Sequence, residues 1–465
     1  MKYLDDLYKG EKHIPIRDIK TDSRNIESGD LFVAIKGFYV DHSEFVDDAI
    51  KAGCSAIVSD KLLEKSVPCI KVANLNEELT RLCKEFYNYN NDLELIGITG
   101  TDGKTTTATI IHQLLSNFTK NAYLGTNGIC YNNIKQKTEN TTPSKEYLYK
   151  CFSSLRDANC KSVVMETSSE ALLHDRVDSF KFKYAIYTNI TEDHLNIHKT
   201  LENYINSKLK LINYLDKDGV IILNSDDEVL KDIASSHKIY TYGKNSRADF
   251  QILDINLDSK TTFKIKYLNK IYEIESPYPF EYNIYNLTVG FIVCVLEGYS
   301  AEEIIKYIRK LKPISGRSEE LNFKTDYHII LDYAHTLNGI KNLIENVKNY
   351  NKRIVVVTGS AGGREKEKRS KIGSYLLDNA NFVVFTMDDP RYEKVDDIID
   401  DMLKDTNKNN YTRIVDRKEA INYALSNAKK DDYILIIGKG RDNYMALEDK
   451  RVPYSDYEVI KSYFD

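Results

Sequence analysis

The sequence predicts an α/β protein of three domains. The chain length, the alternation of strand and helix patterns, and two breaks in this alternation support that prediction. The chain has 465 residues, and since a domain usually contains about 100–200 residues, several separate cores can form. Short apolar runs typical of buried strands alternate with helix-length segments. The polar stretch 87–92 and the pair Lys312-Pro313 interrupt this alternation. We therefore expect domains at residues 1–92, 93–312 and 313–465.

The first domain is predicted to be a small α/β unit, because apolar runs at 31–35 and 56–58 flank a helical pattern at 45–52. The other two domains contain apolar runs separated by segments long enough for crossover helices. These runs lie at 95–98, 162–165, 184–188 and 220–223, and then at 329–331, 354–357, 382–385 and 433–437. Strands that alternate with helices in this way form mostly parallel sheets. We expect a central parallel-sheet domain and a Rossmann-like α/β domain at the C-terminus.

Charge and composition exclude several classes of protein. The chain has 65 basic and 70 acidic residues, a formal charge of −5, and no basic block of the kind that follows a nucleic-acid backbone. No uncharged apolar stretch reaches the roughly 18 residues of a membrane span, and residues 1–7 lack an export signal. The 7 cysteines never form a Cys-x-x-Cys pair, which is typical of reduced cytosolic thiols. We expect a cytoplasmic protein that binds neither nucleic acid nor membranes.

A glycine-containing loop follows the first strand of the second domain and has the composition of a nucleotide-phosphate site. Its residues, with the start of the next helix, are Gly100, Thr101, Asp102, Gly103, Lys104, Thr105 and Thr106. In such a loop, backbone N–H groups face the phosphates, Lys104 supplies positive charge and Thr105 can bind Mg²⁺. The motif is the short form G-x-x-G-K-T, since Ile98 stands where the longer form begins with glycine. We prefer ATP binding to the alternative of a glycine turn that only begins a helix.

Two further polar side chains follow strands of the same predicted sheet. Glu166 comes directly after the run 162–165, and His194 lies shortly after the run 184–188. Because both strand ends are expected beside the phosphate loop, the carboxylate and the imidazole are suitable ligands for a Mg²⁺ ion that joins phosphate to substrate. Either residue alone would more often form a cap, a turn or a structural contact.

The order of these motifs resembles that of the Mur ligases. Within that family it is most similar to the ligases that add a diamino acid to UDP-N-acetylmuramoyl-L-alanyl-D-glutamate. The resemblance covers nearly the whole chain, although any one motif alone would be weak. The matching segments are residues 22–24, 29–34, 100–106, 140–143, 166–176, 193–195, 283–287, 316–317, 332–336, 362–369, 388–391 and 438–440.

The resemblance implies the three-domain Mur ligase architecture. An N-terminal domain would bind the UDP end, a central P-loop domain would bind ATP, and the C-terminal domain would bring the amino acid. ATP would phosphorylate the γ-carboxylate of the D-glutamate, and the incoming amine would displace phosphate, in a monomeric enzyme of peptidoglycan precursor synthesis. Metal and lysine charge would offset the repulsion between the two anions that must meet.

The resemblance also implies roles for individual side chains. Ser23 would contact the uracil. The muramoyl-peptide would contact Asn140, Thr141, Thr142, Ser168, His174 and Arg176, although the family usually has glutamine in place of His174. The adenosine and phosphates of ATP would contact Asn286, Arg317, Asp332 and His335.

Lys208 matches a lysine that is carbamylated in related enzymes, and a carbamate presents the oxygen ligands that Mg²⁺ prefers. Without the resemblance, a solvated helix lysine would be the better interpretation. The predicted catalytic residues are Lys104, Glu166, His194 and Lys208, and the predicted metal ligands are Thr105, Glu166, His194 and carbamylated Lys208.

By the same resemblance, the pocket for the added amino acid contains Arg364, Asp388, Asp389, Pro390, Arg391, Gly438 and Asp442. The family's enzymes for meso-diaminopimelate usually have D-N-P-R here, and Arg391 can hold the distal carboxylate of that substrate, which lysine lacks. Asp389 replaces the usual asparagine, and its carboxylate can hold a distal ammonium group or cancel the charge of Arg391. We favour meso-diaminopimelate over L-lysine.

Two other classes of function are compatible with parts of the sequence. One is another amide ligase of the same superfamily, such as one that adds a different residue or a folylpolyglutamate synthase. The Asp22-Ser23-Arg24 segment argues against the folate enzyme, which lacks a UDP-binding domain. The other is a nucleotide-gated binding protein that has lost ligation, and the presence of Lys104, Glu166, His194 and Lys208 argues against it.

Overall fold

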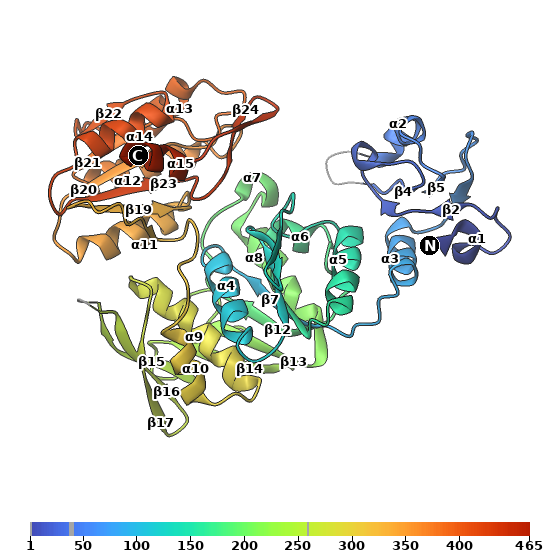
Figure 1. Ribbon diagram of the computed structural model, residues 1–465, viewed down its shortest axis with the longest axis horizontal. Coiled ribbons are helices and arrows are strands. Elements are labelled where there is room, and N and C mark those ends of the chain that lie inside the picture. The colour runs from blue at the N-terminus through green and yellow to red at the C-terminus, as the bar shows by residue number, and fades with distance from the viewer. Residues whose placement is uncertain (1, 37–40, 258–259) are drawn as a thin grey trace.

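The computed structural model describes residues 2–36, 41–257 and 260–465, and its strands form three large sheets and two short ribbons. Figure 1 shows the blue N-terminal part on one side of the green central part, with the orange and red C-terminal part above it on the other side. The predicted boundaries at residues 92 and 312 fall between elements of different sheets, and we propose them as domain boundaries. Among the described helices, none combines the length and apolar character that a membrane span requires.

The N-terminal part is built on a parallel four-stranded sheet in the order β3-β4-β5-β6. Its strands are β3 (Ile19–Lys20), β4 (Leu31–Val33), β5 (Ala56–Ser59) and β6 (Cys69–Lys71), and a ribbon joins β1 (Lys2–Tyr3) to β2 (Pro15–Ile16). Its helices are α1 (Leu4–Leu7), η1 (Ser23–Asn25), η2 (His42–Phe45), α2 (Val46–Lys51) and α3 (Leu75–Phe86). The Asn74 side chain caps α3 by accepting from the N–H groups of Asn76 and Glu77.

The central part has an 11-stranded sheet in the order β10-β9-β8-β11-β7-β12-β13-β14-β15-β16-β17. Its parallel strands are β8 (Asn121–Gly125), β11 (Ser162–Glu166), β7 (Glu94–Thr99), β12 (Phe182–Tyr187), β13 (Leu215–Asn224), β14 (Lys238–Gly243) and β15 (Phe250–Asn256). Antiparallel strands complete both edges: β9 (Gly128–Tyr131), β10 (Ile134–Gln136), β16 (Thr262–Tyr267) and β17 (Lys270–Glu275). The predicted parallel strands are confirmed, whereas the edge strands were not predicted.

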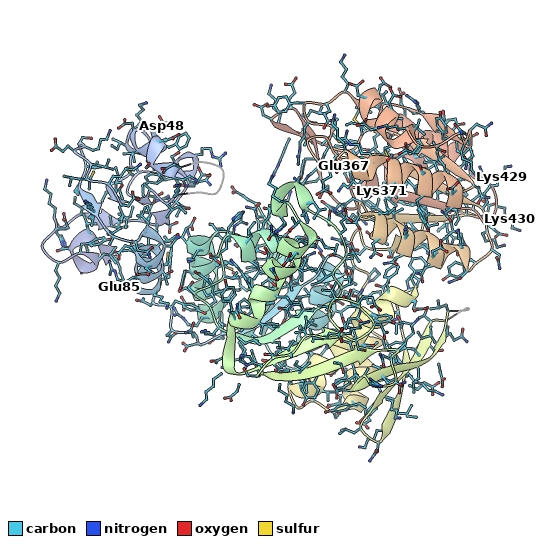
Figure 2. The ribbon with its side chains drawn as sticks, turned by 180° about the vertical axis from the view of Figure 1, so that it is seen from behind. Asp48, Glu85, Glu367, Lys371, Lys429 and Lys430 are labelled. Atoms are coloured by element: carbon cyan, nitrogen blue, oxygen red, sulfur yellow. The ribbon has the colours of Figure 1, made fainter. Side chains whose placement is uncertain are left out.

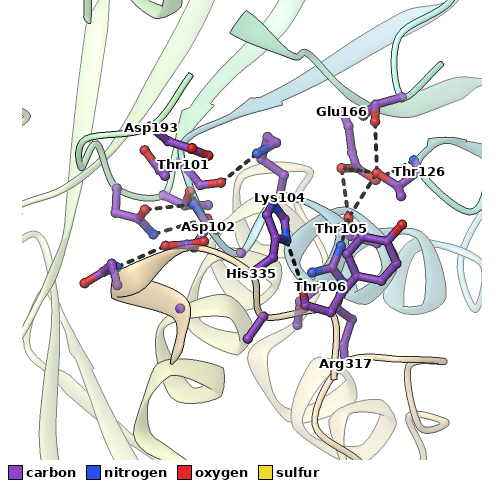
Figure 3. Close-up of a pocket in the computed structure, with 18 of the residues that line it drawn as sticks. Thr101, Asp102, Lys104, Thr105, Thr106, Thr126, Glu166, Asp193, Arg317 and His335 are labelled. Atoms are coloured by element: carbon purple, nitrogen blue, oxygen red, sulfur yellow. Dashed lines mark hydrogen bonds between the residues drawn. The ribbon is translucent and has the colours of Figure 1, made fainter. Parts of the chain in front are cut away.

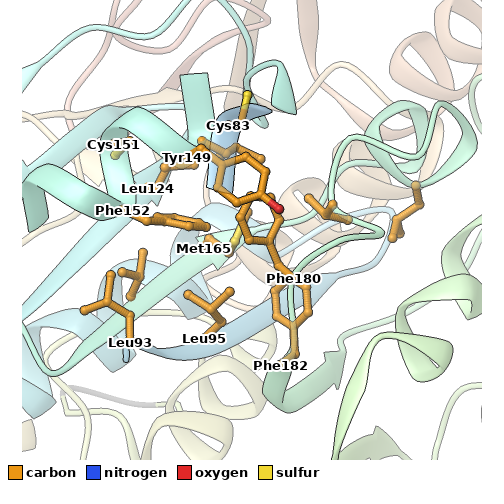
Figure 4. Packing of buried hydrophobic residues seen from close by; sticks show 14 of the residues in the cluster. Cys83, Leu93, Leu95, Leu124, Tyr149, Cys151, Phe152, Met165, Phe180 and Phe182 are labelled. Carbon is orange, nitrogen blue, oxygen red and sulfur yellow. The ribbon is translucent and has the colours of Figure 1, made fainter. Parts of the chain in front are cut away.

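Both faces of this sheet are covered by helices, so the buried strands alternate between two cores. Leu95 contributes to one core and its neighbour Ile96 to the other. The first core includes aromatic rings such as Phe152 and Phe180, whose centroids lie 5.0 Å apart (Figure 4). The helices are α4 (Lys104–Leu115), α5 (Lys145–Asp157), α6 (Ser169–Leu173), α7 (Leu195–His198), α8 (Leu201–Asn213), α9 (Glu281–Leu296) and α10 (Ala301–Ile308).

The C-terminal part has a six-stranded sheet in the order β18-β19-β23-β20-β21-β22, parallel except for β18. Its strands are β18 (Glu319–Glu320), β19 (His328–Asp332), β20 (Ile354–Thr358), β21 (Phe382–Phe385), β22 (Tyr411–Arg413) and β23 (Tyr433–Ile437), with a separate hairpin of β24 (Tyr444–Leu447) and β25 (Lys450–Pro453). The four predicted runs are all strands.

Helices again cover both faces of the C-terminal sheet. They are α11 (Leu337–Lys348), α12 (Glu367–Asn379), α13 (Val395–Leu403), α14 (Arg417–Ser426) and α15 (Asp456–Phe464). Charged side chains such as Glu367, Lys371, Lys429 and Lys430 are exposed on the outside of this part (Figure 2). The carboxyl ends of β19 and β23 lead into the segments that carry the predicted site residues of this part.

Candidate active site between the central and C-terminal parts

The phosphate loop connects β7 to α4, as predicted, and its glycines are required by close contacts. Gly100 has φ 152°, and a Cβ atom there would lie 1.9 Å from the Thr188 hydroxyl oxygen. Gly103 has φ 82° in the left-handed region, and a Cβ atom there would lie 2.9 Å from Oδ1 of Asn286. Any larger residue would therefore be strained and crowded at both positions. The loop leaves the first N–H groups of α4 facing a cavity.

Two lysines meet at the beginning of this loop. Lys104 Nζ donates to the carbonyl oxygens of Gly100 and Thr101 at 2.9 and 2.8 Å. Lys208 Nζ, from α8, donates to the Gly100 carbonyl at 2.5 Å and lies 4.5 Å from the centroid of the Tyr204 ring. Burial lowers the pKa of Lys104 and lowers that of Lys208 well below its usual value, with Lys104 adding to the second effect.

Glu166 lies at the end of β11 and is fully buried among hydrogen-bond donors. Its Oε1 accepts from the Tyr123 hydroxyl at 2.6 Å and from the Thr126 N–H at 2.9 Å. Its Oε2 accepts from the Thr105 hydroxyl at 2.9 Å (Figure 3). Gly125 allows this approach, because a Cβ atom there would lie 2.2 Å from Oε1. The carboxylate is therefore fixed directly against the first turn of α4.

Arg317 reaches the same threonine from the C-terminal part. Its Nη2 donates to the Thr105 hydroxyl oxygen at 3.1 Å, and its guanidinium carbon lies 4.8 Å from the centroid of the Tyr333 ring (Figure 3). Asp332 holds this segment by accepting from the N–H groups of Ser318 and Ala334 at 2.5 and 2.6 Å. Burial raises the pKa of Asp332. In this arrangement Asp332 orients the segment that carries Arg317.

His194 follows β12 and lies beside Asp193 at the same cavity, with 3.4 Å between Nε2 and Oδ2. Burial lowers the pKa of His194 to about 4, so its imidazole is neutral near pH 7 and has a lone pair available. Burial raises the pKa of Asp193, but His194, which is protonated at the acid pH where Asp193 titrates, and Lys368 outweigh it and lower the pKa to about 2. Asp193 therefore stays ionised.

A cavity of about 960 Å³ brings most of the predicted residues together. Its lining includes Thr101, Asp102, Gly103, Lys104, Thr105, Thr106, Asn140, Thr141, Glu166, Ser168, Arg176, His194, Lys208, Asn286, Arg317, Asp332, His335, Arg364 and Asp442. Gly100 contributes its carbonyl just behind these residues. The cavity is therefore lined by both the central and the C-terminal parts.

Some predicted residues lie outside that lining. Thr142 lies behind it, where its hydroxyl donates to the Glu166 carbonyl and accepts from the Ser168 N–H. His174 follows the end of α6, and Ser23 begins η1 in the N-terminal part. Residues 388–391 and Gly438 also lie outside the lining, in the C-terminal part, where Asp389 pairs with Lys439 and Gly438 lies against Asp388. The cavity thus gathers the nucleotide residues and only part of the predicted amino-acid pocket.

Sequence reasoning missed several residues that hold the site. Tyr123 and Thr126 fix Glu166, Tyr204 lies against Lys208, and Asn189 holds the phosphate loop. Lys439 stands inside the predicted segment 438–440, which was the one local signal that could have identified it. The two tyrosines, Thr126 and Asn189 had no sequence pattern that marked them as site residues, because only the fold brings them beside the loop and its charged groups.

This geometry defines a class of protein. A phosphate loop, a fixed carboxylate and an arginine from a second domain meet at one threonine, which is the arrangement of an enzyme that uses the phosphates of a nucleotide. Comparisons with known proteins extend this result over the whole chain. Residues 15–97 match the Mur ligase family catalytic domain, residues 98–294 the Mur ligase middle domain, and residues 316–440 the Mur ligase glutamate ligase domain.

Relatives that match over nearly the whole chain indicate the same family. The UDP-N-acetylmuramoyl-L-alanyl-D-glutamate--2,6-diaminopimelate ligases of Clostridium tetani and Clostridium perfringens are 35% and 36% identical to the chain. These matches cover 98% and 99% of the chain and 96% and 97% of the relatives. The chain belongs to the Mur ligase family. The predicted family is thereby confirmed.

Solved structures confirm the three-domain architecture. A structure of a UDP-N-acetylmuramoyl-L-alanyl-D-glutamate--2,6-diaminopimelate ligase has a TM-score of 0.66 at 25% identity and covers 100% of this chain and 99% of its own. The MurF ligase of Thermotoga maritima in complex with ADP has a TM-score of 0.68 at 20% identity, over 92% of this chain and 95% of its own. The second match concerns the fold alone.

Proposed function

We propose that the protein is an ATP-dependent ligase that joins 2,6-diaminopimelate to UDP-N-acetylmuramoyl-L-alanyl-D-glutamate. The observation that carries the proposal is the meeting of the phosphate loop, Glu166 and Arg317 at the Thr105 hydroxyl. The names of the full-length relatives support the choice of substrates. Because one proposed substrate is linked to UDP and the reaction consumes ATP, we also propose that the enzyme acts in the cytoplasm, as a monomer.

The proposed reaction has two steps. A γ-carboxylate oxygen of the D-glutamate attacks the γ-phosphorus of ATP, which forms an acyl-phosphate and releases ADP. The amine of the diamino acid then attacks the acyl carbon, forms the amide bond, loses a proton and expels phosphate. Lys104 and Arg317 both line the cavity. We propose that their positive charge offsets the repulsion between carboxylate and phosphate.

The residues at the phosphate loop fit a magnesium ion. The Thr105 hydroxyl and the Glu166 carboxylate lie 2.9 Å apart at the cavity, and both supply the oxygen ligands that Mg²⁺ prefers. We propose these two as ligands, with the neutral imidazole of His194 as a further donor. When bound, Mg²⁺ would neutralise phosphate charge. Tyr123 and Thr126 donate to Glu166 and so orient its carboxylate toward the proposed metal position.

We propose that Lys208 carries an N6-carboxyl group in the active enzyme. Burial lowers the pKa of Lys208 well below its usual value and so favours the neutral amine. A neutral amine attacks the carbon of CO₂ to form a carbamate with release of a proton. The carbamate oxygens would face Lys104 at the same loop. Supplying ¹³CO₂ should give a carbamate ¹³C resonance that is absent from Lys208→Met. A spectrum identical to that of the variant would refute the modification.

For the remaining substrate contacts we retain the roles implied by the family. We propose Asn140, Thr141, Ser168 and Arg176 for the muramoyl-peptide, because all four line the cavity. His335 and Asn286 line the cavity too and are proposed for the nucleotide. Ser23 is proposed for the uracil, and Arg391 for the distal carboxylate of the amino acid.

The test of the proposal is the substrate dependence of phosphate release from ATP. We expect release only when both UDP-N-acetylmuramoyl-L-alanyl-D-glutamate and a diamino acid are present, with one amide formed per phosphate. Release with folate and glutamate instead would indicate a folylpolyglutamate synthase. Release that is indifferent to both substrates, or none at all, would refute ligation and favour a nucleotide-binding protein.

A further inference from the structure

Asp102 in the phosphate loop makes its side-chain contacts with the C-terminal part. Its Oδ1 accepts from the Thr336 hydroxyl at 3.1 Å, and its Oδ2 accepts from the side-chain amide of Asn338 at 3.0 Å. Thr336 is the N-cap of α11, and its hydroxyl oxygen also accepts from the Gly339 N–H at 2.9 Å. Both carboxylate oxygens are thus bound by the beginning of one helix in another domain.

The backbone of Asp102 is fixed independently of these contacts. Its N–H donates to Oδ1 of Asn189 at 3.0 Å, and its carbonyl accepts from the Thr188 hydroxyl at 2.6 Å and from the Asn189 amide at 3.1 Å. The end of β12 therefore holds the peptide in place, and the side chain lies between the phosphate loop and the segment that contains His335 (Figure 3).

The first turn of α11 is shaped to receive this carboxylate. Residue 339 is glycine, and a Cβ atom there would lie 2.9 Å from the hydroxyl oxygen of Thr336, so the glycine leaves room for the hydroxyl that binds Asp102. The first turn has no acidic residue of its own. An anion is stabilised at a helix N-terminus by the helix dipole and the free N–H groups, and here Asp102 supplies that anion from a different domain.

The segment that precedes α11 connects this helix to Arg317. Asp332 lies four residues before Thr336 and holds the N–H of Ser318, which directly follows Arg317. Docking of α11 on Asp102 therefore carries Arg317 to the Thr105 hydroxyl. Asp102 also belongs to the predicted phosphate loop, where an unpaired carboxylate would repel the phosphates of a bound nucleotide. Pairing with α11 removes that repulsion only when the domains are together.

We propose that Asp102 is a positioning residue that holds α11 against the phosphate loop and so couples closure of the C-terminal domain to placement of Arg317. The part of this proposal that concerns catalysis rests on the proposed ligase function. The structural part does not, since domain separation can be measured without any reaction.

The test uses three variants of the full-length chain. Asn338→Asp places two carboxylates opposite each other and should separate the domains. Asp102→Asn leaves one acceptor oxygen and should separate them less. The double variant Asp102→Asn/Asn338→Asp exchanges amide and carboxylate, which restores a donor–acceptor pair and should restore the distance. Asn351→Asp adds the same charge at an exposed position beyond α11 and serves as the control.

The first readout is energy transfer between fluorophores on the central and C-terminal domains in the absence of ligand. The second is the split between kcat and KM for ATP. For Asn338→Asp we expect lower transfer and a kcat about tenfold lower, with recovery of most of both in the double variant. Unchanged transfer in Asn338→Asp, or a double variant no better than that single variant, would overturn the proposal. If no variant or parent protein turns over, the transfer measurement alone still decides it.

Discussion

The Nζ atom of Lys439 lies 2.8 Å from Oδ1 of Asp389, in the segment proposed to bind the added amino acid. The same carboxylate oxygen accepts from the Ala446 N–H at 2.8 Å. Lys439 is 1% exposed, and although burial lowers its pKa, Asp388 and Asp389 together raise it above the usual value. Lys439 thus carries the charge that neutralises Asp389, which leaves Asp389 neither free to hold a substrate ammonium nor able to cancel Arg391.

Arg391 should therefore determine the choice of diamino acid. Its guanidinium donates to the Gly362 carbonyl at 3.2 Å, and the proposed ligand of its remaining donors is the distal carboxylate of diaminopimelate. We expect Arg391→Ala to lower kcat/KM for meso-diaminopimelate by about 10- to 100-fold, because a charged hydrogen-bonded pair is lost. Ligation rates with L-lysine should not fall. A parent enzyme that prefers L-lysine, and is indifferent to this substitution, would contradict the assignment.

Removing the lysine should produce the opposite change in preference. In Lys439→Met the carboxylate of Asp389 loses its positively charged partner and becomes available to an ammonium group or to Arg391. We expect the ratio of kcat/KM for L-lysine to that for meso-diaminopimelate to rise, on the order of tenfold. The double variant Lys439→Met/Asp389→Asn removes the freed charge and should return the ratio toward that of the parent. If the ratio does not move in Lys439→Met, the lysine has no part in specificity.

The carboxylate at the phosphate loop gives a third prediction. Glu166→Gln keeps the shape of the side chain but removes the charge that faces Thr105, so we expect kcat to fall by about 100-fold or more and the requirement for Mg²⁺ to increase. Tyr123→Phe removes only one donor to Glu166 and should cost about tenfold. Titration of activity against Mg²⁺ distinguishes the two. Equal Mg²⁺ dependence in Glu166→Gln and the parent would exclude Glu166 as a ligand.

A buried ion pair in the C-terminal part supports the proposed amino-acid pocket. Arg417 and Asp456 are both fully buried and lie 2.8 Å apart, and Arg417 also donates to the carbonyls of Met387 and Ile437. These two carbonyls directly precede Asp388 and Gly438. Arg417 therefore fixes the beginnings of both segments of the proposed pocket.

Asp456→Asn should destabilise the protein by about 3 kcal/mol, because it leaves a buried guanidinium without its counter-charge. It should also raise KM for the diamino acid more than KM for ATP. Asp400→Asn breaks an exposed pair with Arg413 and should cost less than about 1 kcal/mol. Urea unfolding and the two KM values provide the measurement. A parallel rise in both KM values would indicate general loss of structure instead of a local role.

Local patterns in the sequence were sufficient for the features that depend on neighbouring residues. The apolar run around Ile96 predicted β7, and the spacing of Gly100, Gly103 and Lys104 predicted the loop that follows it. The strands β16 and β17 were not predicted, because the prediction relied on continuous apolar runs. Their apolar residues alternate with lysines and glutamates, which is the pattern of a strand with one buried face.

Pairings between distant residues had no local signal at all. Asp102 and Asn338 lie 236 residues apart, and each is ordinary for a loop or for a first helical turn. The same holds for Arg417 and Asp456, which the sequence presents as two unremarkable surface charges although the fold buries both. Only the packing of one domain against another, or of one helix beside a strand end, converts such residues into parts of the site.

A buried histidine provides a prediction for acid stability. His198, 3% exposed, lies between the hydroxyls of Ser169 and Ser207, and burial, aided by the charge of Lys208, lowers its pKa to about 4. The unfolded chain has the ordinary value near 6.5. Protonation therefore favours the unfolded chain, so the contribution of His198 is complete above pH 6.5 and is lost as the pH falls toward 4.

The loss should reach about 3 kcal/mol at most, from about 1.4 kcal/mol for each unit of pKa difference. We expect the urea concentration at the unfolding midpoint to decrease in the parent as the pH is lowered from 7 to 4.5. The decrease should be smaller in His198→Asn. His194 has a pKa lowered to about 4 as well and keeps part of the slope in that variant. His13→Asn, at a side chain that is 67% exposed, should retain the full slope. If His198→Asn follows the parent curve, His198 titrates alike in the folded and unfolded chains.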